Sequence, residues 1–206
     1  MTSNDENSRR GYLARSIILT IGGGALGCSI LTALSCDFIG VENVVVTENA
    51  FSDAPYLKTV GLFSFNSAAN ESCEHYRTRL LHSNFNEWFT IGQIASLAAP
   101  ALGLIGWILV LSELLISQCR FNGSFVLQNV LFIAAFTFQC CTFLLLGQTQ
   151  FCFYDKMFHC TWEIGSILSI IAASMFYLCS ILLCCLSRPK HFPNDHDDRE
   201  CEDDKV

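Results

Sequence analysis

Four long apolar segments constrain this chain more than any other feature of its sequence. Each one reaches or approaches the roughly 20 residues that an α-helix needs to cross a bilayer, and each contains at most one charged residue. The chain is therefore predicted to fold as an all-α membrane protein, a four-transmembrane-helix bundle. The predicted membrane spans are residues 17–35, 91–116, 124–147 and 163–186.

The segments between these spans complete the predicted domain plan. Half of the 206 residues are hydrophobic and only 15% are charged, which leaves no room for a second globular domain. The tail is rich in acidic residues and poor in apolar ones, so we expect it to be disordered. The plan comprises a cytoplasmic N-terminus (1–16), a first extracellular loop (36–90), an inner turn (117–123), a second extracellular loop (148–162) and a cytoplasmic tail (187–206).

The distribution of basic residues predicts the orientation of the bundle. Cytoplasmic flanks of membrane helices carry an excess of lysine and arginine. In the two predicted outer loops, four basic residues are outnumbered by eight acidic ones. We therefore expect both termini in the cytoplasm, in the plasma membrane or a secretory-pathway membrane, and without a basic patch nucleic acid is not an expected partner. The basic residues that flank the spans on the predicted cytoplasmic side are Arg9, Arg10, Arg15, Arg120, Arg188 and Lys190.

Four of the twelve cysteines fall in the predicted outer loops. Cys36 and Cys73 lie in the first loop, and Cys152 and Cys160 lie in the second. An even number of cysteines on an oxidising side indicates disulfides. Four cysteines allow three pairings, of which one bridge within each loop, Cys36–Cys73 and Cys152–Cys160, is preferred.

Two glycosylation sequons test the same topology. Asn70 begins Asn-Glu-Ser in the first outer loop, and we expect it to carry a glycan. Asn122 begins Asn-Gly-Ser in the inner turn and should stay unmodified.

The first span has an alternative interpretation as a cleaved signal peptide. Basic residues precede an apolar stretch that ends in small residues just before Cys36, as in a secretory signal. In favour of a retained helix, the segment contains Gly22-Gly23-Gly24 and a Gly23-x-x-x-Gly27 spacing that lets another helix approach closely. Cleavage would leave three spans in the same orientation.

Small residues also recur at intervals of four in two other spans. We interpret these stripes as packing surfaces within the bundle, with a homo-oligomer or partner contact as the alternative. Glu113 is the single charge inside the second span, and we expect it near the helix end rather than in a transport path. The stripes are Ala95, Ala99 and Gly103, and Gly165, Ser169 and Ala173.

The first outer loop carries strand-like patterns. Residues 42–47 and 57–65 are rich in β-branched or aromatic side chains and are separated by turn-forming residues. They are predicted to pair as a small disulfide-tied β element. Residues 71–89 show a helical pattern that leads into the second span.

The first outer loop also carries a family resemblance. Gly61-Leu62-Phe63 is similar to the Gly-Leu-Trp of the claudin and peripheral-myelin-protein superfamily, and Cys73 follows it. A short N-terminus, four spans, a large first loop and a small second loop resemble that superfamily as well. The resemblance implies recognition through Gly61, Leu62 and Phe63, and a non-catalytic role in adhesion, barrier formation or modulation of another membrane protein.

No motif indicates catalysis, a metal or a cofactor. Membrane thiol–disulfide oxidoreductases use a Cys-x-x-Cys pair, and the chain has none. Several potential ligands cluster in the first outer loop, but their spacing matches no zinc pattern. They are Glu71, Cys73, Glu74, His75 and His82.

Cysteines on the predicted cytoplasmic side indicate palmitoylation. Cys119 lies beside the inner turn, and Cys184 and Cys185 end the fourth span, where this modification occurs. Apolar packing is the alternative explanation.

The sequence therefore predicts a non-catalytic protein of adhesion, membrane organisation or accessory-subunit type. Its expected partners are the lipid bilayer and either another membrane protein or further copies of itself. One alternative is an oligomeric channel lined by Asp37, Glu42 and Glu48. A membrane thiol–disulfide oxidoreductase is a more distant one.

Overall fold

Four long helices dominate the computed structural model, and all four are long and apolar enough to cross a membrane. The short 3₁₀ helix η1 (Thr142–Gly147) follows α4 directly. The four helices are α1 (Ser3–Leu34), α3 (Glu87–Leu115), α4 (Ser124–Cys141) and α6 (Ile164–Leu186). The structure describes residues 3–41, 57–67, 73–75, 87–115, 124–147, 153–154, 157–158 and 160–186.

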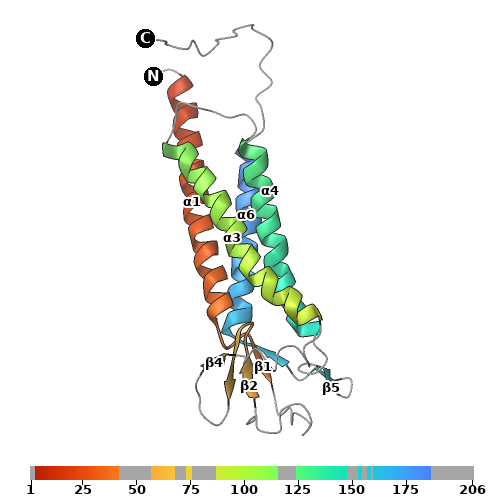
Figure 1. Ribbon diagram of the computed structural model, residues 1–206. Helices are drawn as coiled ribbons and strands as arrows, with labels where there is room; N and C mark the ends of the chain where they lie inside the picture. Colours follow the sequence, from red (N-terminus) through yellow and green to blue (C-terminus); the bar gives the residue numbers. More distant parts are fainter. Residues whose placement is uncertain are drawn as a thin grey trace, which may run out of the picture.

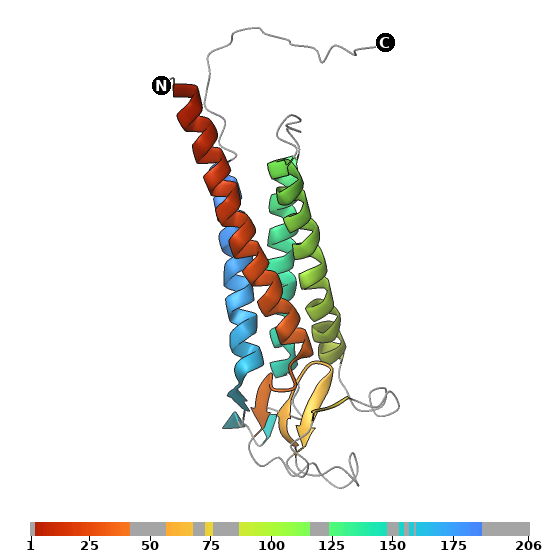
Figure 2. The ribbon, with the colours of Figure 1, turned by 90° about the vertical axis from the view of Figure 1, so that its left-hand side faces the viewer.

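The helices form an elongated bundle with a β-sheet at one end (Figures 1 and 2). Helix α1 packs against α3 and α6, and α4 packs against the same two helices, so α3 and α6 occupy diagonal positions. Large buried side chains fill the centre, among them Ile18, Phe132, Phe176 and Leu183. The multi-pass prediction is thus supported by the length, the composition and the packing of these helices.

The helices extend beyond the predicted spans at two of their ends. Helix α1 begins at Ser3 and not at residue 17, although its apolar section begins only at Tyr12. Helix α3 begins at Glu87, before the predicted residue 91. The spans were delimited by apolar composition, whereas a helix satisfies its own backbone hydrogen bonds and can continue past the apolar region.

Five strands from both predicted outer loops form one antiparallel sheet. The strand order is β4-β3-β2-β1-β7, so that the strand from the second loop pairs with the first strand of the first loop. Strands β5 (Phe153–Tyr154) and β6 (Met157–Phe158) form a separate pair. The five strands are β1 (Ile39–Val41), β2 (Leu57–Val60), β3 (Ser64–Ser67), β4 (Cys73–His75) and β7 (Cys160–Trp162).

The sheet corrects two sequence predictions. The helical pattern assigned to residues 71–89 is wrong at its start, because Cys73–His75 is strand β4 and pairs with β3. The segment 57–65 is not one strand, since it turns at Gly61 and continues as β3. Cross-strand pairing overrides local propensity in short segments of this kind. The predicted strand 42–47 lies outside the described residues.

The small-residue stripes of the second and fourth spans face the inside of the bundle, as the packing interpretation predicts. Ala95, Ala99 and Gly103 are buried on α3. A Cβ atom on Gly103 would lie 2.6 Å from the ring of Phe176 on α6, so glycine makes room for the ring that reaches across the bundle. By contrast, a Cβ atom on Gly27 of α1 would meet no atom within 4 Å.

Buried polar side chains join three helices near the sheet. Ser29 of α1 donates to Gln139 Oε1 at 2.6 Å, and Gln139 Nε2 donates to Ser169 Oγ of α6 at 2.8 Å. The hydroxyls of Thr142 and Ser169 lie 2.9 Å apart. Because each buried group has a partner, this network fixes the helices relative to one another.

Candidate functional site

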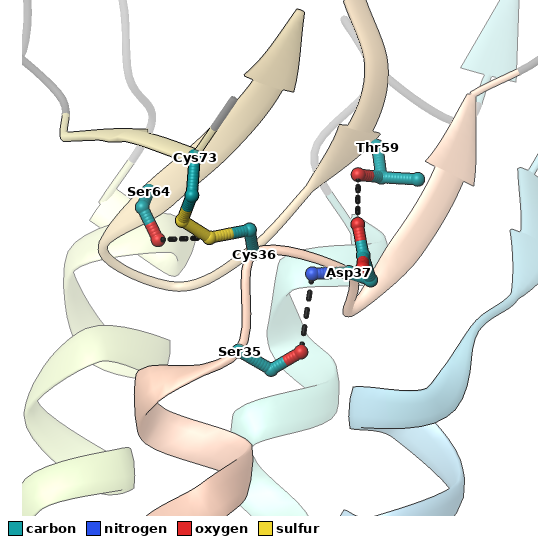
Figure 3. Close-up of a disulfide and its surroundings, with 6 residues drawn as sticks. All are labelled: Ser35, Cys36, Asp37, Thr59, Ser64 and Cys73. Carbon is teal, nitrogen blue, oxygen red and sulfur yellow. Dashed lines mark hydrogen bonds between the residues drawn. A yellow bond between two sulfur atoms is a disulfide. The ribbon is translucent and has the colours of Figure 1, made fainter. Parts of the chain in front are cut away.

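The junction between the sheet and the helices contains the disulfide and most of the hydrogen bonds that position the sheet (Figure 3). Cys36, two residues after α1, is bonded to Cys73, the first residue of β4, and the Cα atoms are 5.9 Å apart. The Oγ atom of Ser64 lies 3.2 Å from the sulfur of Cys36. The bridge preferred from the sequence therefore forms, and it ties an edge strand of the sheet to the end of α1.

Asp37 connects three elements at this junction. Its backbone N–H donates to the Oγ atom of Ser35 at 3.1 Å, and its carboxylate accepts a short hydrogen bond from Thr59 of β2 (Figure 3). Its carbonyl oxygen accepts the N–H of Gly165 on α6 at 2.8 Å. A Cβ atom on Gly165 would lie 2.9 Å from that carbonyl, so glycine permits the contact.

The tripeptide Gly61-Leu62-Phe63 forms the turn between β2 and β3 and seats the sheet on α3. A Cβ atom on Gly61 would lie 2.9 Å from the Cα atom of Cys36, and it would also meet the carbonyl oxygen of Ser35. Leu62 is fully buried, and its carbonyl accepts the Nε2–H of Gln93 at 2.7 Å. Phe63 is half-buried. Of the three residues predicted to take part in recognition, Leu62 is thus an anchor inside the protein.

Aromatic rings fill the space between the sheet and η1. The rings of Phe38 and Phe143 lie 5.6 Å apart between centroids, and those of Phe143 and Trp162 lie 6.2 Å apart. Phe38 is fully buried, whereas Trp162 is 59% exposed. The buried Phe38 ring and its aromatic neighbours form a small apolar cluster between the sheet and the helices.

The remaining predicted site residues lie apart from this junction. Cys160 is in β7, and Cys184 and Cys185 are exposed at the end of α6 opposite the sheet (Figure 1). Asn129 of α4 donates to the sulfur of Cys184 at 3.3 Å. Cys152, Asn70 and Cys119 lie outside the described residues, as do Glu42 and Glu48.

Glu113 has a basic partner at the end of the bundle away from the sheet. The Arg15 guanidinium of α1 lies 3.4 Å from the Glu113 carboxylate of α3, and both side chains are largely buried. The same guanidinium lies 5.5 Å from the centre of the Phe125 ring on α4. This ion pair agrees with the expectation that Glu113 sits near a helix end.

The described residues of this junction form a fixed surface. No group of three or more potential metal ligands occurs among them. Cys73 is bonded to Cys36, so it supplies no thiolate to the group of potential metal ligands that the sequence places in the first outer loop. The contacts at this junction position the sheet on the helices.

Two contacts that position the sheet were not predicted from the sequence. Gln93 and Gly165 contact the backbone of Leu62 and Asp37, which lie 31 and 128 positions earlier in the chain, and no local pattern signals such contacts. In comparisons with known proteins, the chain matches no family model and no curated protein.

Proposed function

We propose that this chain is a non-catalytic multi-pass membrane protein that presents a fixed extracellular sheet for adhesion, membrane organisation or association with another membrane complex. One observation carries the proposal: strands from both predicted outer loops join in one five-stranded sheet. A disulfide at the end of α1 and hydrogen bonds from α3 and α6 hold that sheet on the bundle. A rigid surface lowers the ordering cost of binding a partner.

The proposed membrane placement puts the sheet outside and both termini in the cytoplasm. The start of α1, the end of α6, the end of α3 and the start of α4 share the end of the bundle opposite the sheet (Figures 1 and 2). The excess of basic residues belongs to that end. The positive-inside bias therefore supports this orientation.

The pairing of polar groups within the helices supports a non-transporting role. Intramembrane charges in transporters and pumps line the path of the substrate. Here Glu113 is paired with Arg15, and Gln139 is bonded to Ser29 and Ser169. These contacts hold helices together, and we assign them to the stability of the bundle.

The similarity to the claudin and peripheral-myelin-protein superfamily is part of the same proposal. Four apolar helices and a disulfide-tied sheet that includes Gly61-Leu62-Phe63 accord with that resemblance. What it implies for this chain is contact between membranes or between membrane proteins.

A cell-aggregation assay tests the proposal. Cells that display the full chain are mixed with labelled cells that display it or lack it, and proteins that co-purify are identified in parallel. Thr161 is exposed on β7, so Thr161→Lys changes the charge of the sheet without removing a buried group. We expect Thr161→Lys to reduce aggregation or partner recovery at least fivefold at equal surface expression.

The matched control alters the membrane region instead. Thr137 is exposed on α4 and donates to its own helix at 2.9 Å, so Thr137→Val should leave aggregation and partner recovery unchanged. Ion conductance by the purified chain in liposomes, or quinone-dependent disulfide exchange, would contradict the proposal. Equal loss in both variants would also contradict a role for the sheet.

A further inference from the structure

Helices α4 and α6 share an outward face that carries an exposed tyrosine and a partly buried asparagine. Each helix presents residues at i, i+4 and i+7, a spacing that places them on one face. We call this face the α4/α6 seam. Its residues are Asn129, Ile133 and Phe136 of α4, and Tyr177, Ile181 and Cys184 of α6.

Direct contacts join the two sides of the seam. The rings of Phe136 and Tyr177 lie 5.3 Å apart between centroids. At the other end of the seam, Asn129 donates to Cys184 at 3.3 Å and accepts a hydrogen bond from Ser180 at 2.5 Å. The seam is therefore one continuous surface across both helices.

Tyr177 is in an unusual position for a tyrosine on a membrane helix. Its side chain is 52% exposed, and its hydroxyl makes no hydrogen bond to any residue that the structure describes. Tyr177 lies nine residues before the end of α6 at Leu186, which corresponds to about 14 Å along a helix. Tyrosines that face lipid concentrate at the membrane interface, and this one lies near the middle of the hydrocarbon.

Hydrocarbon offers the Tyr177 hydroxyl no hydrogen-bonding partner, and a polar group left without one there is costly. Asn129 is partly buried and keeps one unused donor, because its amide has two N–H groups and one is used by Cys184. The opposite face of the bundle differs. On α3 the exposed side chains inside the span are aliphatic, including Ile94, Leu97 and Ile108.

We propose that the α4/α6 seam is the contact surface for a second copy of this chain. Two copies inserted in the same orientation are related by a two-fold axis normal to the membrane, so each residue meets groups at its own depth. A hydroxyl and a primary amide are each both donor and acceptor. The hydroxyl of Tyr177 and the amide of Asn129 can therefore pair with the same groups of the second copy at both depths.

No other occupant meets these requirements as directly. Lipid chains supply no donor or acceptor at the depth of Tyr177. A different membrane protein would need matching polar groups at two separate depths, whereas a second copy has them by symmetry. Interhelical hydrogen bonds and close packing are the forces that associate helices in lipid.

The inference rests on the membrane placement proposed above, but not on the role of the sheet. The test uses the full chain, labelled at its N-terminus with donor or acceptor fluorophores and reconstituted in phosphatidylcholine vesicles. Energy transfer is measured as the protein-to-lipid ratio falls. Extraction of the vesicles at alkaline pH checks insertion separately, so release from the vesicles would refute the placement and not the seam.

Paired variants locate the contact. Tyr177→Phe keeps the ring and removes only the hydroxyl, and we expect it to raise the dimer dissociation constant about threefold to tenfold. Ile181→Trp adds bulk at a residue that is 40% exposed on the seam, and should raise the constant more than tenfold. The controls are Tyr12→Phe and Ile108→Trp, at exposed residues of α1 and α3, and each should stay within twofold of the parent chain.

Three results would overturn the proposal. The first is that the inserted parent chain stays monomeric at every protein-to-lipid ratio. The second is that Ile108→Trp weakens the dimer as much as Ile181→Trp does, and the third is that neither seam variant weakens the dimer. Loss of a different co-purifying membrane protein from the seam variants, with a monomeric parent chain, would assign the seam to that protein instead. Equal thermal stability of Tyr177→Phe and the parent chain excludes misfolding as the cause of a weaker dimer.

Discussion

Arg15 and Glu113 form an ion pair between α1 and α3. Substitutions of these two residues test how much the pair contributes to the stability of the bundle. Removing one partner leaves the other charge largely buried and unpaired, which is more costly than removing both. We expect Arg15→Gln to lower the free energy of unfolding by roughly 1–3 kcal/mol, because the pair keeps some contact with solvent. Thermal unfolding in a fixed detergent, followed by size-exclusion chromatography, measures the change.

The double variant Arg15→Gln, Glu113→Gln is the control for this pair. It removes both charges, so it should recover at least half of the stability lost in Arg15→Gln. Additive losses would show that the two side chains act independently.

Two buried glutamines of α4 make a matched comparison of satisfied and unsatisfied polar groups. The side-chain amide oxygen of Gln139 accepts a hydrogen bond from Ser29, and its amide nitrogen donates one to Ser169. Among the described residues, Gln128 Oε1 has no hydrogen-bonding partner, although its amide nitrogen donates to Ser124 at 3.0 Å. A buried acceptor without a partner destabilises a protein, whereas a satisfied network holds it together.

We therefore expect the same substitution to have different effects at the two glutamines. Gln139→Leu should destabilise the protein by about 1–3 kcal/mol, because it leaves the buried hydroxyl of Ser29 without its partner and removes one of the two partners of Ser169. Gln128→Leu should be neutral or stabilising by about 1 kcal/mol. Thermal unfolding of the two variants side by side decides the matter, and equal losses would contradict the assigned partners.

Gly61 and Gly27 differ in how much room the surrounding atoms leave for a side chain. A Cβ atom on Gly61 would meet backbone atoms of Ser35 and Cys36, whereas one on Gly27 would meet nothing within 4 Å. Gly61→Ala should destabilise the junction by about 1–3 kcal/mol, the usual range for overpacking. Gly27→Ala should match or slightly exceed the parent chain in stability.

The fraction of protein that forms the Cys36–Cys73 disulfide reports on Gly61. Mass spectrometry after alkylation under non-reducing conditions measures it in both variants. Undiminished disulfide formation and unchanged stability in Gly61→Ala would contradict the close approach of the turn to the end of α1.

At the scale of elements, the disulfide is expected to stabilise the sheet and leave the helices unaffected. It links residues 37 positions apart, which corresponds to about 3–4 kcal/mol in the chain-entropy model. In Cys36→Ser, Cys73→Ser, amide hydrogen exchange in β2 and β3 should accelerate at least tenfold. Exchange in α4 and α6 should not change, because those helices pack through their own contacts.

The double variant Cys140→Ser, Cys141→Ser is the matched control, since both of these cysteines are free thiols. It should leave exchange in the sheet unchanged. If Cys36→Ser, Cys73→Ser accelerates exchange in the helices as much as in the sheet, the sheet and the bundle unfold as one unit.

The helices could be predicted from the sequence much better than the sheet. Twenty-residue apolar runs have few alternatives in a folded chain, and all four correspond to helices. Strands β1 and β7 have only three residues each, and they pair through contacts that join distant parts of the chain. Short strands are determined by their neighbours rather than by their own composition, which also explains why β4 was predicted as helix.

The candidate site was likewise predicted only in part. Cys36–Cys73 was preferred from cysteine placement, because both residues lie in one predicted loop. The contact between Gln93 and the carbonyl of Leu62 depends on where the β2–β3 turn meets α3. A sequence specifies such a contact only through the complete fold.

At the scale of the whole molecule, the two ends of the bundle are chemically different. The sheet, the disulfide and Asp37 lie at one end, while the Arg15–Glu113 pair and the exposed Cys184 and Cys185 lie toward the other. Disulfides form on the oxidising side of a secretory-pathway membrane, and palmitoylation modifies cysteines at the cytoplasmic side. The disulfide thus supports the orientation proposed from the basic residues, and palmitoylation of Cys184 and Cys185 stays a prediction of that orientation.

Glycosylation tests this orientation in the intact chain. The sequon at Asn70 falls between β3 and β4 in chain order, and the one at Asn122 falls between α3 and α4. These two connections belong to opposite ends of the bundle, so only one of them can face the lumen in a single orientation. We expect a glycan on Asn70 and none on Asn122. Translation in the presence of microsomes, followed by enzymatic deglycosylation, should show one mass shift that Asn70→Gln abolishes and Asn122→Gln preserves. A glycan on Asn122 alone would place the sheet in the cytosol, where the Cys36–Cys73 bridge is not expected to persist.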